Sequence, residues 1–265
     1  MNILTVLAQA TDNPDVFQVF WANGIQKQGL LKVHVTAGAA DKDVIAELGA
    51  LHHLLVVKAV FGQDRAGRAA QKQSVGSTPD EDADRLQLYV TSGQIKKLMQ
   101  QKSKKPHLNP FAFFLATRFA GSNITVSQDR QWIKPRALEN VEEITVGAAL
   151  DDLMDVPGVG LAAVSVHAIE QIQRRGNGLS LAEAWHQIRR VVRNLDYEVL
   201  VSEEKRRRDV DRHGFSGRYL YSTLTEWNVI VTPAKGHDRS VPVIATAYFE
   251  RRPQSELVRI EKAAA

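Results

Sequence analysis

Three stretches near the start of the chain, LTVLAQA (residues 4–10), VFQVFWA (16–22) and LLKVHVT (30–36), decide the fold of its first half. Each is short and rich in Val, Leu and Phe, which favour β-strands. The pairs Asn13-Pro14 and Asn23-Gly24 separate them, and both are typical of turns. The pattern predicts three antiparallel strands joined by short connections.

A helix is expected next, because apolar residues recur at helical spacing over residues 44–55 and Asp41 is a plausible N-cap. Residues 63–84 have no apolar periodicity and are expected to form a loop. A strand over 86–90, helices over 93–101 and 109–119, and a strand over 124–127 follow. This alternation predicts an α+β domain with a mixed sheet over residues 1–135.

The second half of the chain begins with helices instead of strands. We expect helices over residues 146–154, 161–175 and 181–193, a charged loop over 202–217, and strands over 218–224, 228–232 and 241–250. A charged segment containing Pro135 is expected to separate the two halves at residues 130–145. A second, smaller domain, in which helices precede an antiparallel sheet, would then occupy residues 145–265.

The composition is that of an ordinary globular protein, with 44% hydrophobic residues, 24% charged residues and no cysteine. A chain without cysteine forms no disulfide, which favours a reducing compartment, and we predict a cytoplasmic location. We see no signal peptide, and the apolar run over residues 54–61 is too short to cross a bilayer, so no membrane association is expected. No cofactor is expected.

The formal net charge of +4 is unevenly distributed along the chain. Residues 1–157 contain 17 Lys and Arg against 17 Asp and Glu, whereas residues 158–265 contain 17 against 13. A local excess of Lys and Arg attracts polyanions, because these side chains displace counterions from phosphates. We therefore expect any nucleic-acid affinity to lie in the second half and to weaken with salt.

The order of elements over residues 1–130 resembles the ribonuclease H fold. Glu47, within DVIAELGALHHLL (43–55), stands where the first helix of that family carries a glutamate, and LYVTS (88–92) resembles its strand-end Tyr-Thr-Asp-Ser pattern. The enzymes of the family hold two magnesium ions with a cluster of carboxylates. Here Thr91 or Ser92 replaces the strand-end aspartate, and the first strand has no acid in its middle. The resemblance therefore implies a degenerate domain, and we expect no metal site.

Two interpretations compete over residues 144–176. PGVG (157–160), between two expected helices, resembles a helix-hairpin-helix motif, whose glycines allow backbone N–H groups to face a DNA phosphate. Alternatively, VHAIEQIQRRG (166–176) resembles the opening helix of RelE/ParE-like proteins, and VIATAY (243–248) resembles their closing strand. Gln171 replaces the usual arginine of that family, and residues 202–217 form a charged insertion.

The second resemblance implies a ribonuclease of the wider barnase-like group, which cleaves RNA without metal. Such an enzyme needs a base for the ribose 2′-OH, an acid for the leaving 5′-oxygen and a cation for the phosphate. His167 is the candidate acid or base, because histidine titrates near neutrality. The remaining candidate catalytic residues are Arg174, Arg175, Tyr219, Tyr221 and Thr246, and the candidate nucleic-acid-binding residues are Arg206, Arg207, Arg208 and Lys235.

The sequence thus favours an RNA-binding protein with metal-independent endoribonuclease activity. Two alternatives stay open. One is a non-catalytic nucleic-acid-binding protein, and the other is a protein-interaction or inhibitor module built on decayed nuclease folds, such as an inhibitor in a mobile-element or defence system. Geometry distinguishes them, because an enzyme of this kind requires His167, an arginine and a second proton carrier to converge on one cleft.

Overall fold

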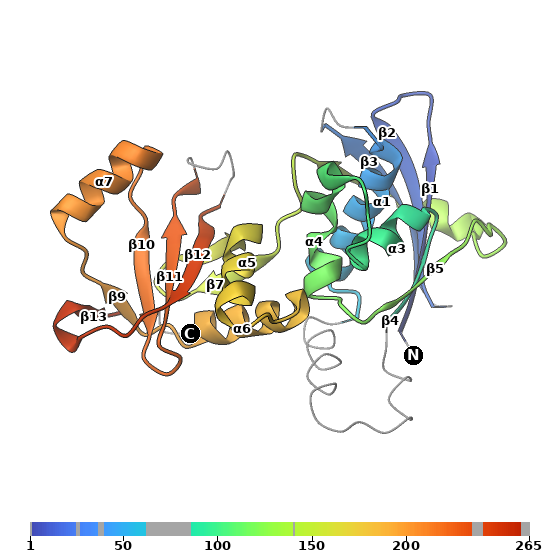
Figure 1. Ribbon diagram of the computed structural model, residues 1–265. Helices are drawn as coiled ribbons and strands as arrows, with labels where there is room; N and C mark the ends of the chain where they lie inside the picture. Colours follow the sequence, from blue (N-terminus) through green and yellow to red (C-terminus); the bar gives the residue numbers. More distant parts are fainter. Residues whose placement is uncertain are drawn as a thin grey trace, which may run out of the picture. The chain divides into compact units, whose positions relative to one another are not determined.

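The protein consists of two compact units, Met1–Leu150 and Asp151–Ala265, each built on one β-sheet (Figure 1). The computed structural model describes residues 2–24, 27–36, 40–61, 86–139, 141–234 and 241–260. Within these ranges, no helix is both long enough and apolar enough to cross a membrane. The predicted mixture of helices and strands, an α+β class with mixed sheets, is confirmed.

Six strands form the sheet of the first unit, in the order β5-β4-β1-β2-β3-β6. Strands β1, β2 and β3 pair antiparallel, whereas β4, β5 and β6 pair parallel to β1, β4 and β3 respectively. The three strands expected near the start of the chain are therefore confirmed. The bounds are β1 (Asn2–Ala10), β2 (Val16–Asn23), β3 (Lys27–Val35), β4 (Leu86–Val90), β5 (Asn123–Val126) and β6 (Val141–Val146).

The helices of the first unit follow the predicted alternation with the strands. Leu48, Leu88 and Phe114, from a helix, a strand and another helix, share one buried core. Asp41 precedes the first helix but does not cap it with its side chain, which instead bonds Lys105 and His107. The expected loop over residues 63–84 lies outside the described residues. The bounds are α1 (Lys42–His52), η1 (His53–Val57), α3 (Gly93–Met99), η3 (Pro106–Leu108), α4 (Asn109–Thr117) and η4 (Pro135–Glu139).

The segment expected to separate the two halves belongs to the first unit. Ala137 of η4 is buried with Leu7, Phe20 and Leu30, and β6 pairs with β3 from Val141 to Val146. Because the boundary lies before Asp151 and not at residue 157, the net charge of each part differs from the sequence-based count. Residues 1–150 hold 17 basic and 14 acidic side chains, and residues 151–265 hold 17 and 16. Net charge therefore does not distinguish the second unit as the nucleic-acid-binding part.

Seven strands form the sheet of the second unit, in the order β13-β9-β10-β11-β12-β8-β7. The expected helix over 181–193 and the three expected strands of this half are confirmed. The strands are β7 (Leu153–Val156), β8 (Gly160–Val164), β9 (Tyr197–Val199), β10 (Arg218–Ser222), β11 (Trp227–Thr232), β12 (Val243–Phe249) and β13 (Leu257–Arg259), and the helices are α5 (Val166–Arg175), α6 (Leu181–Arg193), α7 (Glu203–His213) and η6 (Gln254–Glu256).

The helix-hairpin-helix interpretation is wrong, because residues 153–164 form a β-hairpin. Strand β7 pairs antiparallel with β8, and Gly158 and Gly160 adopt positive φ in and after the turn. Buried Met154 and Val156 alternate with exposed neighbours, which is the period of a strand and not of a helix. Ser165 then caps α5 by accepting a hydrogen bond from the Ala168 N–H at 3.0 Å, so this helix begins five residues later than expected.

The charged loop expected over residues 202–217 is largely a helix, α7. Ser202 caps its start by accepting from the Lys205 N–H, and Gly214, at a φ of 79°, ends it. Apolar periodicity does not reveal α7, because residues 203–212 are exposed or half-buried and almost all of them are polar. The caps are the sequence signal that identifies it.

Candidate functional site

The sheet of the second unit has two chemically different faces. Leu220, Val229 and Ala247 lie side by side on one face and are completely buried, and α5 packs against β12. Their neighbours along the strands point to the other face, which we call the Tyr248 face. It includes Tyr219, Tyr221, Asn228, Ile230, Thr246 and Tyr248.

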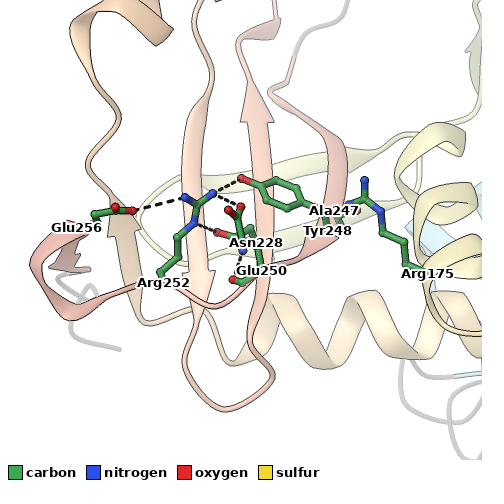
Figure 2. A network of polar contacts seen from close by, with 7 residues as sticks. All are labelled: Arg175, Asn228, Ala247, Tyr248, Glu250, Arg252 and Glu256. Atoms are coloured by element: carbon green, nitrogen blue, oxygen red, sulfur yellow. Dashed lines mark hydrogen bonds and ion pairs between the residues drawn. The ribbon is translucent and has the colours of Figure 1, made fainter.

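Arg252 is the common donor in a network of hydrogen bonds and ion pairs at the Tyr248 face (Figure 2). Its Nη2 donates to the Tyr248 hydroxyl at 2.9 Å and to a Glu250 carboxylate oxygen at 2.5 Å. Its Nε donates to the Asn228 side-chain oxygen at 3.1 Å, and its Nη1 lies 3.5 Å from the Glu256 carboxylate. With its side chain only 14% exposed, Arg252 is held by four partners and fixes the positions of the groups around it.

The network brings a phenol and a carboxylate close together. Because the Tyr248 hydroxyl and Glu250 Oε2 bond the same nitrogen of Arg252, these two oxygens lie within about 5.4 Å of each other. The Tyr248 oxygen accepts from Arg252, so its own proton is available to another acceptor. Burial raises the pKa of Tyr248, with Arg252 and Arg175 opposing it in part. Tyr248 is therefore a neutral proton donor at pH 7.

Arg175, at the end of α5, adds a cation beside the same tyrosine (Figure 2). Its guanidinium carbon is 5.6 Å from the centroid of the Tyr248 ring, and its Nη1 donates to the Ala247 carbonyl oxygen at 3.3 Å. Unlike Arg252, Arg175 is exposed and has no carboxylate partner within the described part of the chain. Its charge is thus available to an anionic ligand.

Three further predicted residues lie on the Tyr248 face. Tyr219 and Thr246 are aligned in one row across β10, β11 and β12, and Tyr221 and Tyr248 are aligned in the next. The Tyr219 hydroxyl donates to Asp209 of α7 at 2.6 Å, and Lys205 lies 4.3 Å from the centroid of its ring. Burial and Asp209 raise the pKa of Tyr219. Because its proton is already donated to Asp209, Tyr219 anchors α7.

His167 and Arg174 are exposed on α5, His167 in its first turn and Arg174 in its last. His167 precedes Arg175 by eight residues, or about 12 Å along the helix axis. The Tyr248 network, as far as the described residues show it, includes α5 only through Arg175. The structure therefore joins Arg175 to the Tyr248 face and leaves His167 outside the network.

The predicted nucleic-acid-binding arginines lie on α7. Because successive helical residues are turned by about 100°, Arg206, Arg207 and Arg208 point in three directions. Arg207 and Arg208 are paired with Glu203 and Glu204 at 4.0 and 3.7 Å, with all four side chains strongly exposed. Such pairs are weak. Lys235 lies outside the described residues.

Sequence reasoning did not identify Tyr248, Glu250 and Arg252 as site residues. Their sequence signal is YFERR (248–252), in which a tyrosine and three charged residues occur at the end of the closing strand. Two more members of the network, Asn228 and Glu256, come from another strand and from η6. Asn228 also donates to the Glu250 backbone oxygen at 2.8 Å, which holds the end of β12 in place.

In the first unit, Glu47 is buried beside the end of β4. Its carboxylate accepts from the Thr91 N–H and, at 3.2 Å, from the Ser92 N–H. Burial raises its pKa to about 7, with the two N–H groups opposing this. The residues of the expected degenerate site thus bond one another. Among the described residues, no group of three His, Asp or Glu side chains is placed to hold a metal ion.

We compared the chain with protein-family models, with characterised proteins and with solved structures, and none of them matches it.

Proposed function

We propose that the second unit is a metal-independent endoribonuclease in which Tyr248 and Glu250 form the acid–base pair. The observation that carries this proposal is that one nitrogen of Arg252 holds both the Tyr248 hydroxyl and the Glu250 carboxylate (Figure 2). An acid and a base no more than about 5.4 Å apart suit a reaction in which one proton is removed and another is delivered on opposite sides of one phosphorus.

The proposed reaction begins when the Glu250 carboxylate takes the proton of a ribose 2′-OH. The 2′-oxygen bonds to the adjacent phosphorus, the bond from phosphorus to the 5′-oxygen breaks, and Tyr248 gives its proton to that 5′-oxygen. Arg175 neutralises the charge that develops on the phosphate oxygens. The products are a 2′,3′-cyclic phosphate and a free 5′-hydroxyl.

The element order of both units supports the proposed family resemblances. In the second unit, α5 and α6 precede an antiparallel β10–β11–β12 meander, as the RelE/ParE-like resemblance implies, although the β7–β8 hairpin and α7 depart from it. In the first unit, three antiparallel strands are followed by the parallel β4 and β5, which supports a ribonuclease H-like arrangement. Glu47 and Thr91 are in contact there, as the aligned motifs imply.

The test is cleavage of a fluorescent single-stranded RNA by the full-length protein in excess EDTA. Tyr248→Phe and Glu250→Gln should each lower the cleavage rate by about 10²- to 10⁴-fold, the usual contribution of general acid–base catalysis. Tyr197→Phe is the matched control, because Tyr197 is half-buried and pairs with Tyr221 on the same sheet. Its cleavage rate should be that of the unchanged protein.

A DNA strand of the same sequence should not be cleaved, because it lacks the 2′-OH. Cleavage that EDTA abolishes would contradict the proposal. RNA binding without cleavage would identify a non-catalytic nucleic-acid-binding protein, and binding of neither nucleic acid would favour a protein-interaction module. If His167→Ala alone removes cleavage while Tyr248→Phe does not, the proton carrier is His167.

A further inference from the structure

Helix α7 is attached to the Tyr248 face mainly at one point. Asp209 accepts from the Tyr219 hydroxyl at 2.6 Å, and Lys205 lies over the Tyr219 ring. Lys205 and Asp209 are half-buried, whereas Arg206, Arg207 and Arg208 are exposed. An 11-residue helix that buries so little gains little stability from packing. Among its exposed basic side chains, Arg207 and Arg208 form only weak pairs with Glu203 and Glu204, so an anionic ligand can displace these carboxylates.

Only some of the basic residues of α7 lie on the face of the helix that is turned towards the sheet. Lys205, Arg208 and Arg212 are spaced by three and four residues and form one basic stripe. Asp209, four residues after Lys205, lies beside this stripe and accepts from Tyr219. Because Lys205 contacts Tyr219, this stripe borders the Tyr248 face. Arg206 and Arg207 are turned by about 100° and 160° from Lys205, away from the stripe.

Helix α7 lies beside β10 and helix α5 beside β12 (Figure 1), so Lys205 of the stripe contacts Tyr219 of β10 and Arg175 contacts Tyr248 of β12. Tyr219 and Tyr248, their contact points on the sheet, are separated by two strand spacings and two residues along a strand, a distance of about 12 Å. Half-buried Ile230 and Thr246 lie between them.

We infer that a single strand of RNA crosses β10, β11 and β12 between the stripe on α7 and Arg175, so that the protein selects unpaired RNA. This inference rests on the function proposed above and adds the class of substrate and its path. Lys205, Arg208 and Arg212 bind phosphates on one side of the acid–base pair, and Arg175 binds the phosphate that is cleaved. Unpaired bases can then contact Ile230 and Thr246, which a duplex would hold away from the sheet.

Fluorescence anisotropy with a 2′-O-methyl RNA strand, which cannot be cleaved, tests the path. Arg208→Gln with Arg212→Gln should weaken binding about tenfold and reduce the slope of log affinity against log salt by about 1.4, because a single strand contributes about 0.7 per phosphate contact. Arg206→Gln with Arg207→Gln removes the same charge from the same helix and should change binding less than twofold. Arg208→Lys with Arg212→Lys should restore most of the affinity.

The outcomes separate this inference from the proposed function. The path is overturned if the two double variants lose the same RNA affinity. It is also overturned if neither double variant loses affinity while Arg175→Gln does. Both results leave the ribonuclease proposal standing. Equal affinity for the strand and for its duplex would overturn the selection of unpaired RNA. A protein that binds no RNA would overturn both. Circular dichroism of each variant confirms that α7 and the sheet are folded.

Discussion

Replacing Glu47 with glutamine should change how the stability of the first unit depends on pH. Glu47 is only 1% exposed, and two backbone N–H groups, those of Thr91 and Ser92, donate to its carboxylate. Burial disfavours the charged form and the N–H groups favour it. Burial is the larger effect, and it raises the pKa of Glu47 from 4.5 to about 7.

The size of the effect follows from this difference in pKa. A carboxyl group whose pKa is higher in the folded chain than in the unfolded chain loses its contribution to stability as the pH rises. The difference of about 2.5, at about 1.4 kcal/mol for each pKa unit, means that ionised Glu47 costs the folded first unit about 3 kcal/mol. Of this, about 2.5 kcal/mol is lost between pH 5 and pH 8.

Hydrogen–deuterium exchange mass spectrometry across a urea series can measure this in the intact chain, with peptides from β1 and β2 reporting on the first unit. The free energy of unfolding of Glu47→Gln minus that of the unchanged protein should increase by about 2.5 kcal/mol from pH 5 to pH 8. Other titrating groups contribute equally to the free energy of unfolding of both proteins, so their contributions drop out of this difference. A difference that is constant with pH would refute the reasoning. A difference that decreases with pH would show that the Thr91 and Ser92 N–H groups outweigh burial.

Three further substitutions test the packing of both units. Gly49→Ala, which normally stabilises a helix, should destabilise the first unit by about 1–3 kcal/mol because the new methyl group meets Val146, and Val146→Ala should rescue it in the same exchange experiment. Ser180→Ala removes a capping box in which the Ser180 hydroxyl accepts from the Glu183 N–H, so it should lower the stability of the second unit by about 1 kcal/mol, measured by thermal unfolding, and a Tm equal to that of the unchanged protein would contradict this. Tyr219→Phe removes the hydrogen bond to Asp209, worth about 1.5 kcal/mol, so amide exchange in α7 should accelerate about tenfold while exchange in α6 stays constant.

The spacing of apolar residues along the chain predicts most of the secondary structure. Strands β1, β2 and β3 and helices α1 and α6 follow from periods of two and of 3.6, because burial of one face imposes those periods locally. The same criterion fails at residues 146–154, which are too few and too uniform to show either period, and pairing with β8 decides that residues 153–156 form a strand. It fails again at α7, whose polar surface carries no apolar period.

The sequence by itself places Arg175 on a helix face and Tyr219 and Tyr221 on one side of a strand, because both statements depend only on local geometry. Only the tertiary structure assembles the Tyr248 network. The register of β11 with β12 sets Asn228 opposite Tyr248, and the chain after β12 turns back so that Arg252 reaches both of them. The partners in such contacts are distant in sequence and are selected by strand pairing, which no local period encodes.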